Sequence, residues 1–208
     1  MFSSRPFRNL GFPVFPIGLG SSYGLGTSGV ERAFERGVNF YLWGSRRRDG
    51  FGEGLSRLPR EKVAIAIQSY TRIGSLMEWS VNRALRVLRT DYVDVLTLAW
   101  WNGPPPKRIL DAALAIREKG KAKMIMVSCH HRPTFEHFIG DASYDALMLR
   151  YNAAHPGAER EVFPLFARRR PGTVAFTATR WGTLIAAGAR PSDCYRFALS
   201  NPNVDVCL

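Results

Sequence analysis

The chain has 208 residues, 46% of them hydrophobic, which is enough to bury a sizeable core in one domain spanning residues 1–208. Its 29 Lys and Arg against 17 Asp and Glu give a formal net charge of +12. That balance favours anionic partners such as phosphates or acidic metabolites, and an arginine-rich solvated surface is the alternative explanation. A nucleic-acid partner is supported by the charge alone, because no recognisable binding motif accompanies it.

Cysteine usage and hydropathy indicate where the protein works. Cys129, Cys194 and Cys207 are too few and too scattered for a disulfide framework or a spaced zinc site. Prolines interrupt the first residues before a signal-type apolar core forms, and no run of 18 apolar residues occurs in the chain. We therefore expect a cytoplasmic protein with no membrane partner.

Apolar stretches typical of strands alternate with amphipathic helical stripes. The clearest strand runs through 91–102, where β-branched and apolar residues stop abruptly at Asn102. Helical stripes flank it over 73–88 and 109–120, the second ending at Gly120 as a left-handed cap would. An earlier helix is expected to begin at the capping box of Ser28 and to stop at Gly37. The expected strands are 14–20, 38–43, 62–70, 91–102, 123–128, 145–151, 173–177 and 204–208.

Strands that alternate with helices predict right-handed β-α-β units and a parallel sheet. Eight such units joined by short loops favour an α/β fold of the closed (β/α)8 barrel type over an open doubly wound sheet. In such a barrel, the functional groups lie at the carboxyl ends of the strands. The candidate site is therefore predicted from the residues that end each strand.

The predicted strand ends are rich in basic and aromatic side chains and poor in carboxylates. This composition disfavours a carboxylate-pair hydrolase and an oxygen-liganded metal centre, so we expect no metal site. Forked guanidinium donors and flat rings suit an anion or a planar ligand. The residues expected to line this mouth are Trp43, Arg46, Arg47, Trp100, Arg150 and Arg180. Of the adjacent pair Trp100 and Trp101, one side chain is expected to line the mouth and the other to pack against a helix.

Short motifs spread along the chain carry a resemblance to a known family. They are Arg8-Asn9-Leu10-Gly11, Ile17-Gly18-Leu19-Gly20, Gly37-Val38-Asn39-Phe40, Asp91-Tyr92-Val93-Asp94-Val95, Gly120-Lys121-Ala122, Val127-Ser128, Tyr151-Asn152 and Ser200-Asn201-Pro202. In this order and spacing they resemble the aldo-keto reductases over nearly the whole chain. The resemblance implies a barrel that reduces aldehydes and ketones with NADP(H), using a tetrad of Asp, Tyr, Lys and His.

The four tetrad positions implied by this resemblance hold other residues, namely Leu42, Arg47, Gln68 and Ala99. Because proton donor, activator and orienting group are replaced together, the standard mechanism is predicted to be lost. A substitute constellation is one imidazole of His130 or His131 as acid or base, with Tyr70, Tyr41 or Tyr23 as proton donor. The alternative for His130 is a polar loop that caps the next helix.

The cofactor contacts implied by the resemblance are also altered. Ser128 keeps the family's serine for the nicotinamide amide, whereas Cys129 stands in place of an Asn. Met148 is nearest to a Gln of the family, and Phe176 replaces a stacking Tyr. The sequence ends at the eighth strand, before the loop and helix that clasp adenosine in the family, and we expect a fragment in preference to a shortened barrel. NADP(H) is the cofactor that the resemblance implies.

Three functions are compatible with these patterns. The first is an oxidoreductase of carbonyl compounds that works with non-standard residues. The second is a pseudoenzyme, a non-catalytic barrel that binds a nucleotide or an anionic metabolite at an arginine-lined mouth. The third is nucleic-acid binding by the basic surface, for which no motif speaks.

Overall fold

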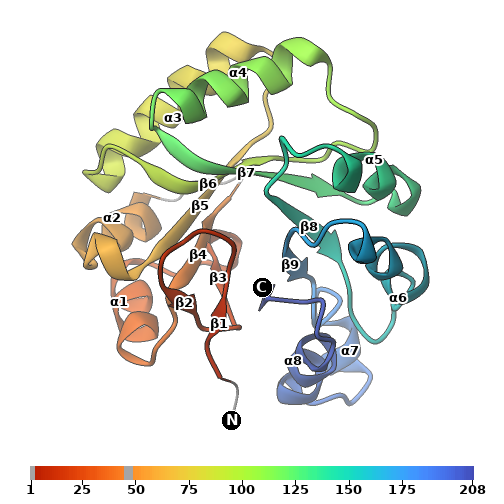
Figure 1. Cartoon of the computed structure of the whole chain (residues 1–208). Helices are drawn as coiled ribbons and strands as arrows, with labels where there is room; N and C mark the ends of the chain where they lie inside the picture. The colour runs from red at the N-terminus through yellow and green to blue at the C-terminus, as the bar shows by residue number, and fades with distance from the viewer. Residues whose placement is uncertain (1–2, 45–48) are drawn as a thin grey trace.

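The eight expected strands pair in chain order as one parallel sheet in the computed structural model, which describes residues 3–44 and 49–208. They are β3 (Leu19–Gly20), β4 (Phe40–Trp43), β5 (Ala64–Ser69), β6 (Val93–Leu98), β7 (Ala122–Cys129), β8 (Ala146–Arg150), β9 (Gly172–Phe176) and β10 (Val206–Cys207). A parallel bridge between Ile17 and Cys207 joins the two edge strands. The sheet therefore curls into the predicted (β/α)8 barrel (Figure 1).

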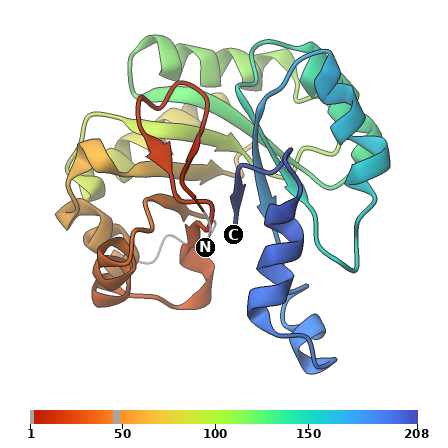
Figure 2. The same ribbon diagram turned by 60° about the horizontal axis from the view of Figure 1, so that its bottom comes forward.

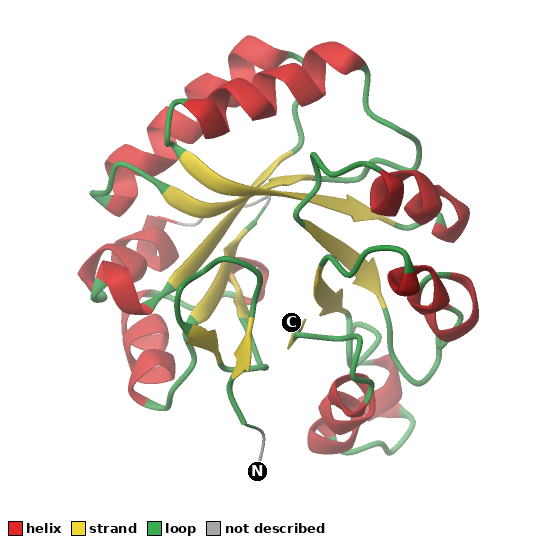
Figure 3. Ribbon diagram, viewed as in Figure 1, coloured by secondary structure: helices red, strands yellow, loops and turns green. Residues whose placement is uncertain are grey.

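Helices surround the strands on the outside of the sheet (Figure 3). They are α1 (Thr27–Glu35), α2 (Asp49–Arg57), α3 (Gly74–Leu88), α4 (Lys107–Glu118), α5 (Phe135–Gly140), α6 (Ala158–Glu161), α7 (Thr183–Ala186) and α8 (Pro191–Ser200). Gly37 and Gly120 have φ angles of 91° and 71° after α1 and α4, which confirms both predicted stops. Within the described residues, no helix has the length and hydropathy that crossing a bilayer requires.

A short antiparallel hairpin precedes the barrel and was not predicted. It consists of β1 (Arg5–Pro6) and β2 (Pro13–Val14), so the expected strand 14–20 is divided between the hairpin and β3. Pro16 lies between the two parts and has no N–H to donate to a ladder. The Arg5 guanidinium donates to the carbonyls of Val204 and Leu199, which places the hairpin beside β10 and α8 (Figure 2).

Side chains alternate between the barrel interior and the layer under the helices. The interior cluster includes Leu42, Ala66, Val95 and Met126, and the hairpin adds Phe7 to it. The outer cluster takes the alternate residues, which are Tyr41, Ile65, Leu96 and Val127. Because interior positions are filled by apolar side chains, the barrel is a packed core with its free space at one end.

Polar side chains at the base of alternate barrel strands bind the strand before them. Each accepts a hydrogen bond from a backbone N–H at 2.7 to 2.9 Å. The four bonds join Asn39 to Phe15, Asp94 to Ile65, Asp145 to Ile125 and Asp205 to Thr173. The aspartates are also paired with Arg60, Arg117 and Arg170. These Asx bonds fix the register at the end of the barrel opposite the site.

Candidate functional site

A cavity of about 190 Å³ lies at the carboxyl ends of the strands, and we call it the mouth. It brings together eight of the predicted site residues, namely Leu42, Gln68, Tyr70, Trp100, Ser128, His130, Met148 and Phe176. Gly20, Ser22, Tyr23, Thr177, Trp181 and Leu208 complete its lining. Within the described residues, no Asp, Glu, Lys or Arg lines it. The mouth is therefore neutral and rich in rings.

Strand register explains why these side chains converge. Gln68 lies opposite Thr97 across the β5–β6 ladder, and Ser128 lies opposite Met148 across the β7–β8 ladder. Gln68 and Ser128 lie two residues after Ala66 and Met126, whose side chains belong to the interior cluster. Because side chains alternate along a strand, Gln68 and Ser128 also point into the barrel. The predicted floor of the site thus follows from the strand period.

Four rings are arranged edge to face across the mouth from β5 to β9. The centroid of Tyr70 lies 5.7 Å from that of Trp100, which lies 6.1 Å from His130. His130 in turn lies 5.3 Å from Phe176, with their planes at 85°. Such edge-to-face contacts hold each ring in a fixed orientation and leave Phe176 available to a planar ligand.

Gln68 and Tyr70 form a hydrogen-bonded pair at one side of the mouth. The Tyr70 hydroxyl donates to Gln68 Oε1 at 3.0 Å. Gln68 occupies the position where the resemblance implies a lysine, and it orients the phenol without adding a positive charge. Ala99 is fully buried and brings no donor to the mouth. Arg47, at the tyrosine position of the tetrad, and Arg46 lie outside the described residues.

His130 is held as a neutral imidazole. Its Nδ1 lies 3.3 Å from Nη2 of Arg150, and a guanidinium carries only donors, so Nδ1 is the acceptor. Burial, and secondly the charge of Arg150, lower the pKa of His130. The proton therefore sits on Nε2, which makes His130 a hydrogen-bond donor at neutral pH.

Two predicted site residues point away from the mouth. Cys129 is fully buried in the outer cluster, where its thiol donates to the carbonyl of His131 at 3.2 Å. Burial raises the pKa of this thiol to about 11, so it is neither a cofactor contact nor a nucleophile. Trp43 also lies in the outer cluster, packed so closely on Gly52 of α2 that a Cβ there would lie 2.5 Å from the indole. Both expectations were wrong.

The arginines expected in the mouth lie beside it. Arg150 is behind His130, with Cζ 5.1 Å from the centroid of the Trp181 ring. Arg180 is exposed in the loop between β9 and α7. The expected arginine-lined mouth is therefore corrected, for the residues that the structure describes, to a neutral mouth with guanidinium groups at its rim.

The adjacent tryptophans diverge as predicted. Trp100 is 61% exposed and lines the mouth, whereas Trp101 packs against the outer cluster. Arg72 fixes the turn between strand and loop, because its guanidinium donates to the carbonyls of Ala99 and Trp100 and stacks 3.8 Å from the Trp101 ring. The turn places Trp100 at a φ of 58°.

Left-handed backbone conformations are concentrated around the mouth. Besides Trp100, the residues Thr177, Arg180 and Trp181 have φ angles of 63°, 51° and 53°. A side chain in this region costs free energy, and it persists where surrounding contacts impose it. Strain in the loop after β9 thus aims Trp181 at the mouth.

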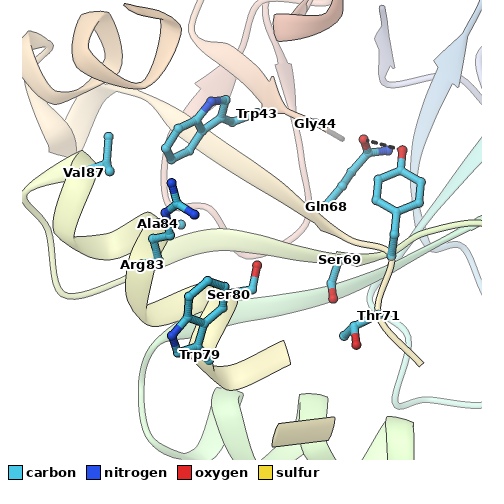
Figure 4. A pocket seen from close by; sticks show the side chains of 11 residues that line it. Trp43, Gly44, Gln68, Ser69, Thr71, Trp79, Ser80, Arg83, Ala84 and Val87 are labelled. Atoms are coloured by element: carbon cyan, nitrogen blue, oxygen red, sulfur yellow. Dashed lines mark hydrogen bonds between the residues drawn. The ribbon is translucent and has the colours of Figure 1, made fainter. Parts of the chain in front are cut away.

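A second cavity, of about 350 Å³, lies outside the barrel between the ends of β4 and β5 and helix α3 (Figure 4). Gln68 and Tyr70 line both cavities. In Figure 4 the Arg83 guanidinium lies between the indoles of Trp43 and Trp79. Sequence reasoning missed this side cavity. The available signal was Trp79, a large ring on the polar face of the predicted helix and 57% exposed in the structure.

Metal binding has no support in the described part of the chain, where no group of three or more His, Cys, Asp or Glu residues converges. The mouth offers instead an amide, hydroxyls, a neutral imidazole and flat rings. These groups can bind a planar ligand through stacking and hydrogen bonds, with Tyr70 able to donate a proton and His130 a hydrogen bond.

Comparison with known structures defines the class of this barrel, although no protein-family model matches the sequence. The aldo-keto reductase AKR11C1 from Bacillus halodurans, in its holo form, superposes with a TM-score of 0.80 at 16% identity, covering 100% of this chain and 85% of that one. An aldo-keto reductase from Klebsiella pneumoniae in complex with NADPH gives 0.75 at 18% identity, covering 88% of this chain and 70% of that one. A structure of an aldo/keto reductase from Klebsiella pneumoniae in complex with NADP and acetate has a TM-score of 0.74 at 18% identity, covering 90% of this chain and 72% of that one. The chain therefore has the aldo-keto reductase fold over its whole length.

Proposed function

We propose that this chain is an aldo-keto-reductase-like oxidoreductase whose mouth holds the nicotinamide ring of NADP(H). The observation that carries the proposal is the neutral, ring-lined mouth in a fold whose Klebsiella pneumoniae counterpart was solved with NADPH. A volume of about 190 Å³ is below the roughly 300 Å³ at which drug-sized ligand pockets begin. It suits one ring with its substituent, with the rest of the dinucleotide outside.

The residues present fit this ring. Phe176 supplies an aromatic face at the end of β9, and stacking requires no charge. The nicotinamide carboxamide needs both a donor and an acceptor, and the Ser128 hydroxyl and the Gln68 amide each provide both. Phe176 retains the stacking role that the resemblance assigns to a tyrosine.

Proton supply rests on Tyr70, and His130 adds a hydrogen-bond donor. A bound nicotinamide supplies the hydride for carbonyl reduction. The Tyr70 hydroxyl, oriented by Gln68, holds a proton at the edge of the mouth, and Nε2 of His130 holds another. We infer that the standard tetrad mechanism is lost, because Leu42, Gln68 and Ala99 supply neither charge nor proton. Reduction then proceeds through Tyr70 and is slow, because no cation in the described mouth activates it.

A non-catalytic binding protein is the second candidate. Leu42 favours it, because it places an apolar side chain at the mouth where the resemblance implies a carboxylate. The two candidates differ in turnover alone, since both require a ligand in the mouth. The three free, buried cysteines support a reducing compartment such as the cytoplasm for either one.

Calorimetric titration of NADPH and NADP+ tests the proposal. We expect binding by the wild-type chain and binding about tenfold weaker by Phe176→Ala, because base-aromatic stacking contributes roughly 1–3 kcal/mol. Phe12→Ala is the matched control, since Phe12 packs at the opposite end of the barrel. No binding of either nucleotide would overturn the proposal. Binding without NADPH oxidation by any simple aldehyde would favour the non-catalytic candidate.

A further inference from the structure

Two arginines at the rim of the mouth lack an acidic partner. Neither Arg150 nor Arg180 forms an ion pair with a carboxylate in the part of the chain that the structure describes. Their neighbour Arg132, by contrast, is paired with Glu161 at 2.8 Å. Two positive charges with no paired carboxylate beside a neutral, ring-lined cavity attract anions to that end of the barrel.

Arg150 is fixed in place by residues of the mouth itself. Its Nη2 lies 3.3 Å from Nδ1 of His130, and its Cζ lies 5.1 Å from the Trp181 ring centroid. Its Nε is buried without a hydrogen-bond partner. A guanidinium held by an imidazole and an indole, with its charge unpaired, is oriented for a ligand and does not behave as a solvated surface group.

Buried Asn152 brings the loops after β8 and β9 together. Its Nδ2 donates to the carbonyl of Thr177 at 2.8 Å, and its Oδ1 accepts from the N–H of Ala154 at 3.0 Å. His155 Nδ1 lies 3.2 Å from the same Oδ1. The loop that carries His155 is thereby tied to the strained loop that carries Arg180.

The charges of the rim arginines also act on His155, which the Asn152 contacts hold between the two loops. Its pKa is lowered first by burial and then by the charges of Arg150, Arg180 and Arg132. With Arg132 paired to Glu161, the remaining field at His155 comes mainly from the two unpaired arginines. An anion placed there would relieve the repulsion between them and would favour protonation of His155.

We propose that Arg150, Arg180 and His155 form an anion subsite at the rim of the mouth, which takes an oxyanion attached to the ring that the mouth holds. The ligand is therefore a planar ring joined to a phosphate or a carboxylate, as in a nucleotide or in an acidic carbonyl substrate. Forked donors from two arginines match either oxyanion. The identity of the ring rests on the proposed function, whereas the subsite rests on its own contacts.

Matched ligand pairs test the subsite by calorimetry. Nicotinamide is compared with nicotinamide mononucleotide for a phosphate, and benzamide with benzoate for a carboxylate. We expect at least one charged ligand to bind about tenfold more tightly than its neutral partner, in line with hydrogen bonds to charged groups. The pair that shows the gain identifies the source of the oxyanion. No gain in either pair would overturn the subsite.

Arginine variants connect the gain to the named residues. Arg150→Gln and Arg180→Gln should each remove most of the tighter binding of the charged ligand. Arg168→Gln should keep that difference in affinity, because Arg168 is exposed and paired with Glu136. Unchanged thermal unfolding shows that the variants fold. NADPH binding by the wild type together with a charged-ligand gain that neither variant reduces would leave the proposed function standing and exclude the subsite. If the chain does not bind NADPH but binds inorganic phosphate in a way that depends on Arg150 and Arg180, the subsite would stand and the proposed function would be excluded.

Discussion

At the scale of single residues, His130 links the electrostatics of the mouth to its chemistry. It contacts Trp100 and Phe176 through its ring and Arg150 through Nδ1, so its protonation would place a second cation next to a guanidinium. The fold avoids that repulsion by keeping the imidazole neutral, and its pKa is lowered accordingly. A neutral His130 can donate from Nε2 while Arg150 keeps its charge for an anion.

Acid should therefore destabilise the protein through His130. In the unfolded chain an imidazole takes up a proton near pH 6.5, whereas the folded state, with its lowered pKa, resists this down to lower pH. Between these two pKa values the unfolded state binds more protons, so stability is present above about pH 6.5 and is lost as pH falls. Melting temperatures of wild type and His130→Asn from pH 7.5 to 5.5 check this. The melting temperature of the wild type should fall further over this pH range than that of His130→Asn. Equal falls in the two proteins would contradict a role for His130 in acid destabilisation.

Tyr70 is the residue on which turnover depends if the chain is an enzyme. Removing its hydroxyl in Tyr70→Phe leaves the ring contact with Trp100 but takes away the donor that Gln68 orients. We expect NADPH oxidation with an aldehyde to fall about 100-fold, the low end of general acid catalysis, with NADPH affinity unchanged. Tyr23→Phe is the control, because Tyr23 lines the mouth but is 72% exposed. Equal rates in wild type and Tyr70→Phe would show that Tyr70 is not the proton donor.

Strand parity decides which site residues could be predicted. Leu42 and Ser128 were placed correctly, and the residues directly after them, Trp43 and Cys129, were assigned to the same mouth although neighbours in a strand face opposite sides. Trp100 and Trp101 were separated correctly, but the turn after β6, with Trp100 at a φ of 58°, sets their directions and strand alternation does not. The position of the Arg150 guanidinium behind His130 could not be predicted in this way, because it depends on a contact between two different strand ends and no local sequence pattern encodes it.

At the scale of elements, the eight strands and the glycine stops of two helices were predictable because hydrophobic period and turn chemistry are local. The amino-terminal hairpin was not, because its two short strands are stabilised by packing of Phe7, Leu10 and Val14 against the barrel interior. The Asx bonds were also missed. Their spacing follows the barrel repeat, and each partner lies on the preceding strand, some 20 to 32 residues away.

The Asx bond of Asp94 should be a large contributor to stability. Asp94 is fully buried, accepts from the N–H of Ile65, and pairs with Arg60 at 2.8 Å. Asp94→Ala leaves a buried N–H and a half-buried guanidinium without their partner, which should cost about 3 kcal/mol. Asp111→Ala, which breaks the exposed pair with Lys107, should cost less than about 0.5 kcal/mol. Urea unfolding of both variants measures the difference, and equal losses would refute the assignment.

At the scale of the whole molecule, positive charge and ring surface are arranged on a barrel whose two ends differ. Arginines at the base are paired with the aspartates of the Asx bonds, whereas Arg150 and Arg180 at the rim have no carboxylate partner among the described residues. Uncompensated charge at the functional end favours small anionic ligands, because it raises their local concentration at the mouth.

The seam that closes the barrel is its least extensive strand contact, and it borders the mouth. β3 and β10 have two residues each, and the seam is the bridge between Ile17, just before β3, and Cys207 of β10. The N–H of Gly18 donates there to the carbonyl of Cys207 at 2.9 Å. Gly20 and Leu208 line the mouth from the two sides of this seam. Short contacts of this kind open more readily than long ladders such as that of β6 with β7.

A ligand in the mouth should therefore hold the seam closed. In hydrogen exchange followed by mass spectrometry, segments containing Gly18 and Cys207 should exchange faster than those of β6 and β7 in the free protein. Because NADPH is expected to bind only the closed barrel, it should slow exchange in the seam segments by a factor of one plus the ratio of the NADPH concentration to its Kd. Exchange at the centre of β6 should stay unchanged. Phe176→Ala, which weakens NADPH binding, should restore fast exchange in the seam segments. Protection that appears equally in all strands would mean that the barrel opens as one unit and that the seam is no separate element.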